Sequence, residues 1–222
     1  MAMSRTLFLL ILALFPIALN ALPRSIGQAV EAFEQGNLQE ARTLLDTAAQ
    51  DPTAQTWPCT WYYRGVVYEG LLRKYIATEE ALDWHIQALE AYQHVLSMTS
   101  PHTQYHSFAQ ANLAGLETYY LDRGRRYYRG ENFMQAMGQF AIVKAMKPQA
   151  PQAYLYAGIA AQQDEDYALA WQNYTEYLSL GASHPAVHRS MAHIAFVQRH
   201  NAAQAQSILD QALAQYPWDQ GL

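Results

Sequence analysis

The sequence predicts an all-α chain of stacked helix-turn-helix repeats. One set of residues recurs at a constant period of about 34 residues, and self-similarity at such a period is typical of helical arrays. Within each copy, large and small residues follow one another at spacings of three, four and seven, which predicts the inward stripe of a helix. The first copy consists of Tyr120, Gly124, Tyr127, Phe133, Ala136, Phe140 and Val143, and the second of Tyr154, Gly158, Ala161, Tyr167, Ala170, Tyr174 and Tyr177.

The repeat resembles the tetratricopeptide repeat (TPR) family. The family pattern has an aromatic residue, Leu-Gly and Tyr in the first helix, then Ala with an aromatic residue four positions later, and a closing Pro. The first copy departs from it at Arg123, where Leu is usual, and the second at Ala161, in the Tyr position. The resemblance implies a right-handed α-solenoid of about four to five repeats in residues 22–222, approximately at 25–52, 57–101, 117–150, 151–184 and 185–218.

Residues 1–21 are predicted to be a secretory signal peptide. Arg5 supplies the positive charge, the run from Leu7 to Leu19 is apolar, and the small residue Ala21 suits cleavage. The apolar run is shorter than the roughly 20 residues of a membrane-spanning helix. The mature protein is therefore expected in the periplasm or outside the cell, and retention of the segment as an N-terminal membrane anchor is the alternative.

The first two repeats differ from the pattern in opposite ways. Residues 25–52 carry small residues but no aromatic anchor, as expected of a terminal repeat with one face in water. Residues 57–101 begin well, with Trp61, Gly65 and Tyr68 at the family spacing. The short turn expected next is replaced by the longer segment 71–80, which keeps apolar helical spacing and predicts extended helices.

Extra helical length is also expected before the third repeat. No Gly or Pro occurs between His102 and Ala114, so this inserted stretch is predicted to continue as helix and to pack as an added layer. The last repeat, 185–218, lacks the aromatic-Gly-Tyr motif and is predicted to be a closing cap, in which Trp218 seals the last helix pair.

Bulk composition excludes some functions. A formal charge of −5 argues against nucleic acid as a partner. The sequence contains no nucleotide-binding or catalytic motif. The protein is therefore predicted not to be an enzyme and not to need a cofactor. Cys59 is the one cysteine of the sequence, which excludes an intrachain disulfide, and it has no neighbouring base in the sequence, which predicts an inert thiol.

Two histidine pairs have a spacing at which a helix could bridge a metal ion. His102 and His106 lie four residues apart, as do His184 and His188. Two histidines without a third ligand make a poor metal site, so a solvated or capping role is expected and no metal is predicted.

The resemblance also implies a partner-binding groove, because first helices line the concave face in this family. Arg125 and Arg129, one helical turn apart, are candidates for binding a partner's carboxylate. The alternative for the basic cluster is a solvated face on which Asp122 pairs with Arg125 or Arg126. The mapped groove residues are Tyr62, Val66, Glu69, Leu121, Arg125, Tyr128, Arg129, Leu155, Ile159 and Gln162.

Two functions follow as hypotheses. The first is an exported, non-enzymatic protein that binds another protein or peptide in its groove, as an adaptor or scaffold in envelope assembly or secretion. The second is an accessory module for cell-wall glycan, which requires exposed aromatic rings. The tyrosines to examine for it are Tyr62, Tyr63, Tyr128 and Tyr156.

Overall fold

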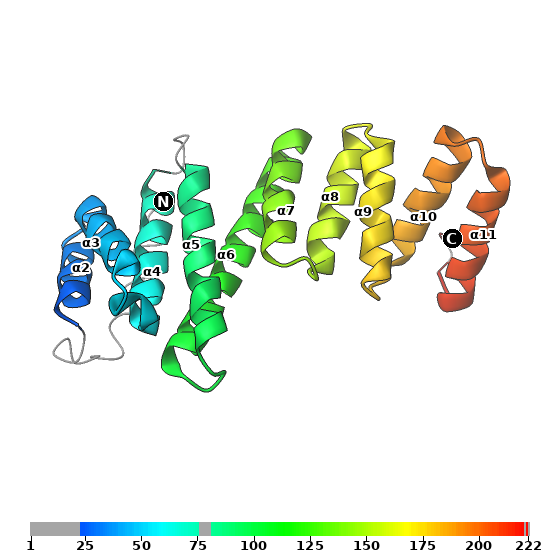
Figure 1. Ribbon diagram of the computed structural model, residues 1–222. Helices are drawn as coiled ribbons and strands as arrows, with labels where there is room; N and C mark the ends of the chain where they lie inside the picture. The colour runs from blue at the N-terminus through cyan, green and yellow to red at the C-terminus, as the bar shows by residue number, and fades with distance from the viewer. Residues whose placement is uncertain (1–22, 76–80, 220, 222) are drawn as a thin grey trace. The chain divides into compact units, whose positions relative to one another are not determined.

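The computed structural model describes residues 23–75, 81–219 and 221. In this part of the chain there are ten α-helices, two short helical turns and no strand, which confirms the all-α fold (Figure 1). The predicted signal peptide lies outside the described residues. The chain forms two compact units, residues 1–114 and 115–222, and the boundary falls inside one long helix, α6.

Unit 1 holds two helical hairpins and the start of α6. Gly36, at φ 81°, ends the first helix in the left-handed conformation that glycine adopts without strain. Ile26, Ala29 and Leu45 are buried between the first two helices, which form a small terminal hairpin as predicted. The elements are α2 (Arg24–Glu34), α3 (Leu38–Gln50), η2 (Ala54–Thr56), α4 (Pro58–Lys74), α5 (Ala81–Met98) and the N-terminal part of α6 (Gln104–Arg129).

The α4–α5 hairpin is a TPR-like pair with longer helices. Gly65 faces the ring of Tyr92 so closely that an added Cβ would lie 2.5 Å from a ring carbon. The stretch of chain between these two anchors is longer than the stretch between Gly124 and Phe140, the corresponding anchors of unit 2. As a result, α4 continues to Lys74 and α5 begins only at Ala81.

Unit 2 repeats the hairpin with the shorter connection. A Cβ on Gly124 would clash with the Phe140 ring, and a Cβ on Gly158 would clash with the Tyr174 ring. The turns repeat as well, because Glu131 and Glu165, which lie one repeat period apart, both adopt positive φ. The elements are the C-terminal part of α6, α7 (Phe133–Met146), α8 (Pro151–Gln163), α9 (Tyr167–Ser179), α10 (Pro185–His193), η3 (Ile194–Gln198) and α11 (Ala202–Gln215).

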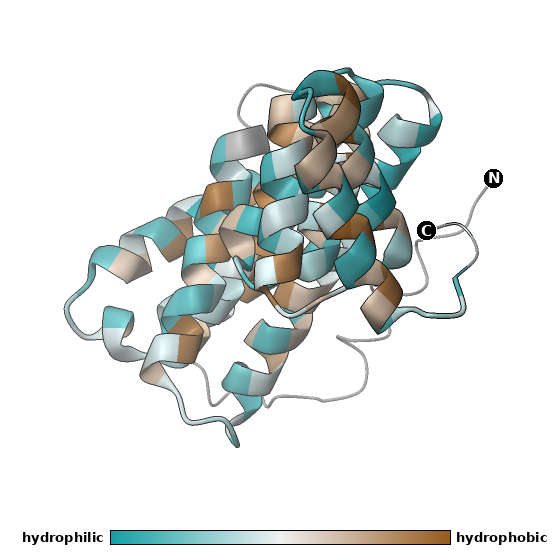
Figure 2. Cartoon of the chain, turned by 90° about the vertical axis from the view of Figure 1, so that its right-hand side faces the viewer, coloured by the Kyte–Doolittle hydropathy of each residue, from teal (hydrophilic) through white to brown (hydrophobic). Residues whose placement is uncertain are grey.

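Hydrophobic and hydrophilic residues alternate along the helices, as amphipathic packing requires (Figure 2). In unit 2 the buried side includes Tyr120, Phe140 and Tyr174. The prediction that Trp218 seals the last helix pair is wrong, because its side chain is 77% exposed. The chain after α11 turns at residues 217–218 without folding that indole back onto the helices.

Candidate functional site: the first-helix face of unit 2

The first helices of the hairpins were expected to present a continuous binding face, and in unit 1 this expectation is wrong. Tyr62, Val66 and Glu69 on α4 are buried. The N-terminal part of α6 covers them, because the rings of Tyr105 and Phe108 both lie with their centroids 5.5 Å from that of Tyr62. The inserted helix is thus the added layer that the sequence predicts, and it occupies the surface of α4.

Glu69 is the centre of a buried polar network. Its carboxylate forms an ion pair with Arg73 at 2.6 Å and accepts a hydrogen bond from the Tyr92 hydroxyl at 2.9 Å. Asn112, on the covering helix, donates to both Glu69 Oε2 and the Tyr92 hydroxyl. Burial, followed by the nearby carboxylate, holds the pKa of Tyr92 well above its usual range. Glu69 therefore stabilises unit 1 and has no free oxygen to offer a partner.

Leu121 is buried too, at 5% exposure, and this corrects its assignment as an exposed groove residue. The other six predicted positions all lie in unit 2, and none of them is fully buried. Their partner-binding role stays a prediction. We call them, together with Phe196 and Val197 of η3 and the preceding residues of α10, the first-helix face of unit 2.

Arg125 is the best-positioned cation of this face. Its guanidinium lies 5.1 Å from the centroid of the Tyr156 ring, and that ring stacks on Phe140 at 5.6 Å. It also pairs with Asp122 at 3.5 Å, as the alternative interpretation of the basic cluster predicts. The side chain keeps 36% of its surface exposed, so the aromatic support orients the guanidinium without removing it from solvent. Arg129, one turn further on, is exposed.

The apolar middle of the face comes from α8. Leu155 and Ile159 are partly buried and pack against the core of unit 2, leaving one edge of each accessible. Gln162 accepts a hydrogen bond at 2.8 Å from the hydroxyl of Tyr174, and burial raises the pKa of that phenol to about 12. Tyr174 also contacts Ser190 of α10, so a single phenol links α8, α9 and α10 behind the face.

The last hairpin also adds residues to this face, which the repeat motif did not predict. Phe196 lies two repeat periods after Tyr128, with Gln162 at the position between them. Val197 lies two repeat periods after Arg129. Phe196 is 60% and Val197 42% exposed. Ala192 stands where the earlier hairpins have the anchor glycine, so a comparison with the repeat motif does not reveal the register of this hairpin. Ala192 is buried in the same way as Gly124 and Gly158.

The remaining candidate residues have structural roles. Cys59 is buried, and burial raises the pKa of its thiol, as expected of an inert cysteine. His106 is buried and hydrogen-bonded to Thr99 at the turn between α5 and α6. His184 caps α10 by accepting a hydrogen bond from the backbone of Ala186.

The described part of the chain offers neither a cluster of metal ligands nor a membrane-spanning helix. In 23–75, 81–219 and 221, no three His, Cys, Asp or Glu side chains gather as a metal site would require. None of the helices in those ranges combines the length and the apolarity of a membrane span.

No protein-family model and no curated protein matches this chain. Solved structures with similar helical folds include MamA 41-end from Desulfovibrio magneticus RS-1, at 15% identity and a TM-score of 0.41, covering 90% of this chain and 99% of that one. A MamA RS-1 double mutant has 14% identity and a TM-score of 0.43, covering 91% and 100%. The TPR2AB domain of yeast Sti1, solved as a complex with pHSP90, has 13% identity and a TM-score of 0.41, covering 85% and 75%.

Proposed function

We propose that the chain is a non-enzymatic binding protein whose first-helix face of unit 2 holds a segment of another protein. One observation carries this proposal. The same face combines partly exposed apolar side chains, Leu155 and Ile159, with an arginine held in place by an aromatic ring. Apolar surface supplies affinity for a peptide, and an oriented guanidinium supplies direction by binding a carboxylate.

The ion pair with Asp122 leaves Arg125 available to a partner. Asp122 is 59% exposed, and exposed pairs contribute only about 0–1 kcal/mol, so a partner's carboxylate can replace it at low cost. Tyr156 keeps the guanidinium oriented during the exchange, which lowers the entropy lost on binding. A polypeptide also suits the acidic chain better than a nucleic acid, because the formal charge of −5 repels phosphates.

The proposal extends to the protein's location. The N-terminal pattern of residues 1–21 supports export, and an exported repeat protein without catalytic motifs suits an adaptor or scaffold in envelope assembly or secretion. N-terminal sequencing of protein recovered from periplasm and medium tests this part. A mature chain beginning at residue 22 is the expected result, and an intact Met1 in the cytoplasm would refute it.

Glycan binding has less support. Tyr62 and Tyr63 are buried within unit 1 and offer no stacking platform. Of the other two tyrosines, Tyr156 already lies between Arg125 and the Phe140 ring. Tyr128 is partly exposed, but its ring packs against that of Phe133 at 5.6 Å between centroids, so these two partly covered rings offer too little surface for a sugar chain.

Site-specific photo-crosslinking tests the proposed face. A benzophenone amino acid replaces Ile159, on the face, or Gln172, an exposed residue of α9 that serves as the control. Mature protein with each label is irradiated in an envelope extract. A protein adduct at position 159 that disappears with Arg125→Glu, and is absent at position 172, is the expected result. Adducts that are equal at both positions would refute a site on this face.

A further inference from the structure

The last hairpin contains a π-helical turn, η3, between α10 and α11. Its register shows one additional residue. The step from Gly158 to Ala192 equals the repeat period, but the steps from Ala170 to Ala205 and from Tyr174 to Leu209 are both longer by a single position. A π turn is how a helix accommodates one inserted residue, and such turns occur frequently at functional sites.

The exposure of the side chains changes sharply within this turn. Ile194 and Ala195 at the start of the turn are buried, whereas Phe196 and Val197 directly after them are 60% and 42% exposed. Elsewhere in unit 2 the corresponding positions are polar or charged: Tyr128 and Gln162 match Phe196, and Arg129 and Gln163 match Val197. Phe196 and Val197 therefore form a continuous exposed apolar spot where the other hairpins place polar groups, and contiguous apolar surface with polar neighbours is typical of interaction sites.

Charge is distributed unevenly over the face. The α6 end carries Arg125 and Arg129, of which only Arg125 has an ion-pair partner among the described residues. The mapped α8 positions, Leu155, Ile159 and Gln162, carry no charge. The α10 end carries the apolar pair of η3, and its one arginine, Arg189 at the position that matches Leu155, is paired with Asp219 at 3.1 Å. In a chain with a formal charge of −5, this arrangement is complementary to a segment that is acidic at one end and apolar at the other.

We propose that Phe196 and Val197 form an apolar anchor site for an extended peptide of the partner protein, whose carboxylate side chain binds at Arg125 and Arg129. The proposal rests on the function proposed above and adds the chemistry of the segment. Packed helices lie roughly 10 Å apart, so the α6 and α10 ends of the face are separated by roughly 20 Å. An extended chain covers about 3.3 Å per residue, which places the acidic and the large apolar residue about six positions apart.

Selection from random peptides tests both parts of this proposal. Peptides of about twelve residues, long enough for that spacing, are displayed and selected on the mature chain, and the enriched ones are synthesised with a fluorescent label. We expect an Asp or Glu about six positions from a Leu, Ile or Phe. Binding of the labelled peptides is measured by fluorescence anisotropy on the wild type, Phe196→Ser, Arg125→Glu and a control variant, Met134→Ser. Met134 is 76% exposed on α7, so its variant removes a similar exposed apolar side chain elsewhere.

The expected result is a loss of affinity of about tenfold or more for Phe196→Ser and for Arg125→Glu, with Met134→Ser within about twofold of the wild type. Because Phe196 is exposed, circular dichroism of its variant should match the wild type.

Peptides that need Arg125 but bind equally well without Phe196 would overturn the anchor site and leave the proposed function standing. If no peptide is enriched, both proposals fail. If Phe196→Ser abolishes self-association in sedimentation experiments and leaves peptide binding intact, a second copy covers the anchor, and the peptide proposal is overturned.

Discussion

Gly158 in α8 lies directly against the ring of Tyr174 in α9, so that a Cβ on the glycine would come 2.6 Å from a ring carbon. The same relationship joins Gly124 to Phe140 and Gly65 to Tyr92. Each of these three hairpins therefore depends on a backbone approach that only glycine allows. The large ring of the second helix fills the space that a side chain would occupy in the first.

Gly158→Ala is expected to destabilise the protein. Alanine is the better helix former by about 1 kcal/mol, but overpacking a well-packed core costs about 1–3 kcal/mol, so the clash with Tyr174 decides the sign. The matched control is Gly138→Ala in α7, where an added Cβ meets no atom within 4 Å and only the helix propensity changes. Urea unfolding should show a lower midpoint for the first variant and a higher one for the second. A higher midpoint for both would contradict this packing.

This contact also shows how far the sequence predicts the fold. The positions of Gly124, Phe140, Gly158 and Tyr174 follow from the repeat register alone, because local spacing decides which helix face is buried. The burial of Tyr62 does not follow from it, since its covering rings, Tyr105 and Phe108, come much later in the chain, in an inserted helix with no register. Non-local packing overrides a repeat pattern wherever an insertion supplies a new layer.

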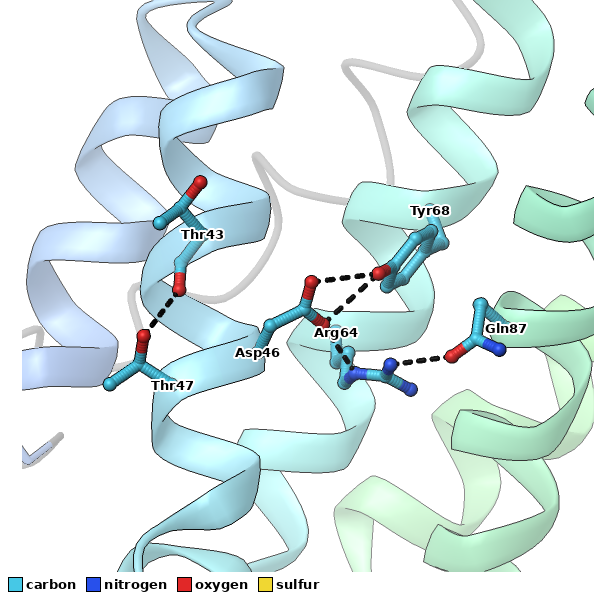
Figure 3. A network of polar contacts seen from close by, with 6 residues as sticks. All are labelled: Thr43, Asp46, Thr47, Arg64, Tyr68 and Gln87. Carbon is cyan, nitrogen blue, oxygen red and sulfur yellow. Dashed lines mark hydrogen bonds and ion pairs between the residues drawn. The ribbon is translucent and has the colours of Figure 1, made fainter. Parts of the chain in front are cut away.

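Asp46→Asn is expected to loosen the first two hairpins of unit 1. The Asp46 carboxylate of α3 accepts hydrogen bonds from Arg64 and Tyr68 of α4, and Arg64 continues to Gln87 of α5, so three helices share one polar network (Figure 3). The amide removes the ion pair and weakens both bonds, which should cost about 1–3 kcal/mol of unfolding free energy. Glu90→Gln, on the exposed side of α5, removes the same charge and should change the stability by less than about 0.5 kcal/mol. Equal effects of the two changes in urea unfolding would assign the loss to net charge instead of the network.

Acid is expected to destabilise unit 1 through His85. This histidine is buried in α5, and burial lowers the pKa of its ring to about 4 from the usual 6.5. Between pH 6.5 and 4 the unfolded chain therefore binds a proton at position 85 that the folded chain does not. The stability of the folded state is thus unaffected by this group above pH 6.5 and falls as the pH decreases toward 4. The loss should approach about 1.4 kcal/mol per pH unit in the middle of this window. Unfolding curves at a series of pH values measure it.

The variants for this test are His85→Gln and His193→Gln. Glutamine at position 85 cannot take up the proton, so the slope between pH 6.5 and 4 should become shallower. His193 is exposed, and its replacement should leave the slope unchanged. An unchanged slope in the position 85 variant would mean that other groups carry the acid sensitivity.

Phe108→Ala tests whether the inserted part of α6 holds the α4 face closed. The ring packs against Tyr62 and, at 6.4 Å, against Tyr105, and it is partly buried. Truncating a buried phenylalanine costs about 3–5 kcal/mol, and partial exposure reduces the expected loss to about 2 kcal/mol. Gln110→Ala, on the exposed side of the same helix, is the control and should change the stability by less than about 0.5 kcal/mol. Asn112 of the same covering helix donates a hydrogen bond to Glu69 of α4, so loosening this helix should also expose α4. Amide hydrogen exchange of residues 62–69 should therefore become faster in the Phe108 variant and not in the Gln110 variant. Unchanged exchange there would show that the polar network holds α4 closed without the aromatic contacts.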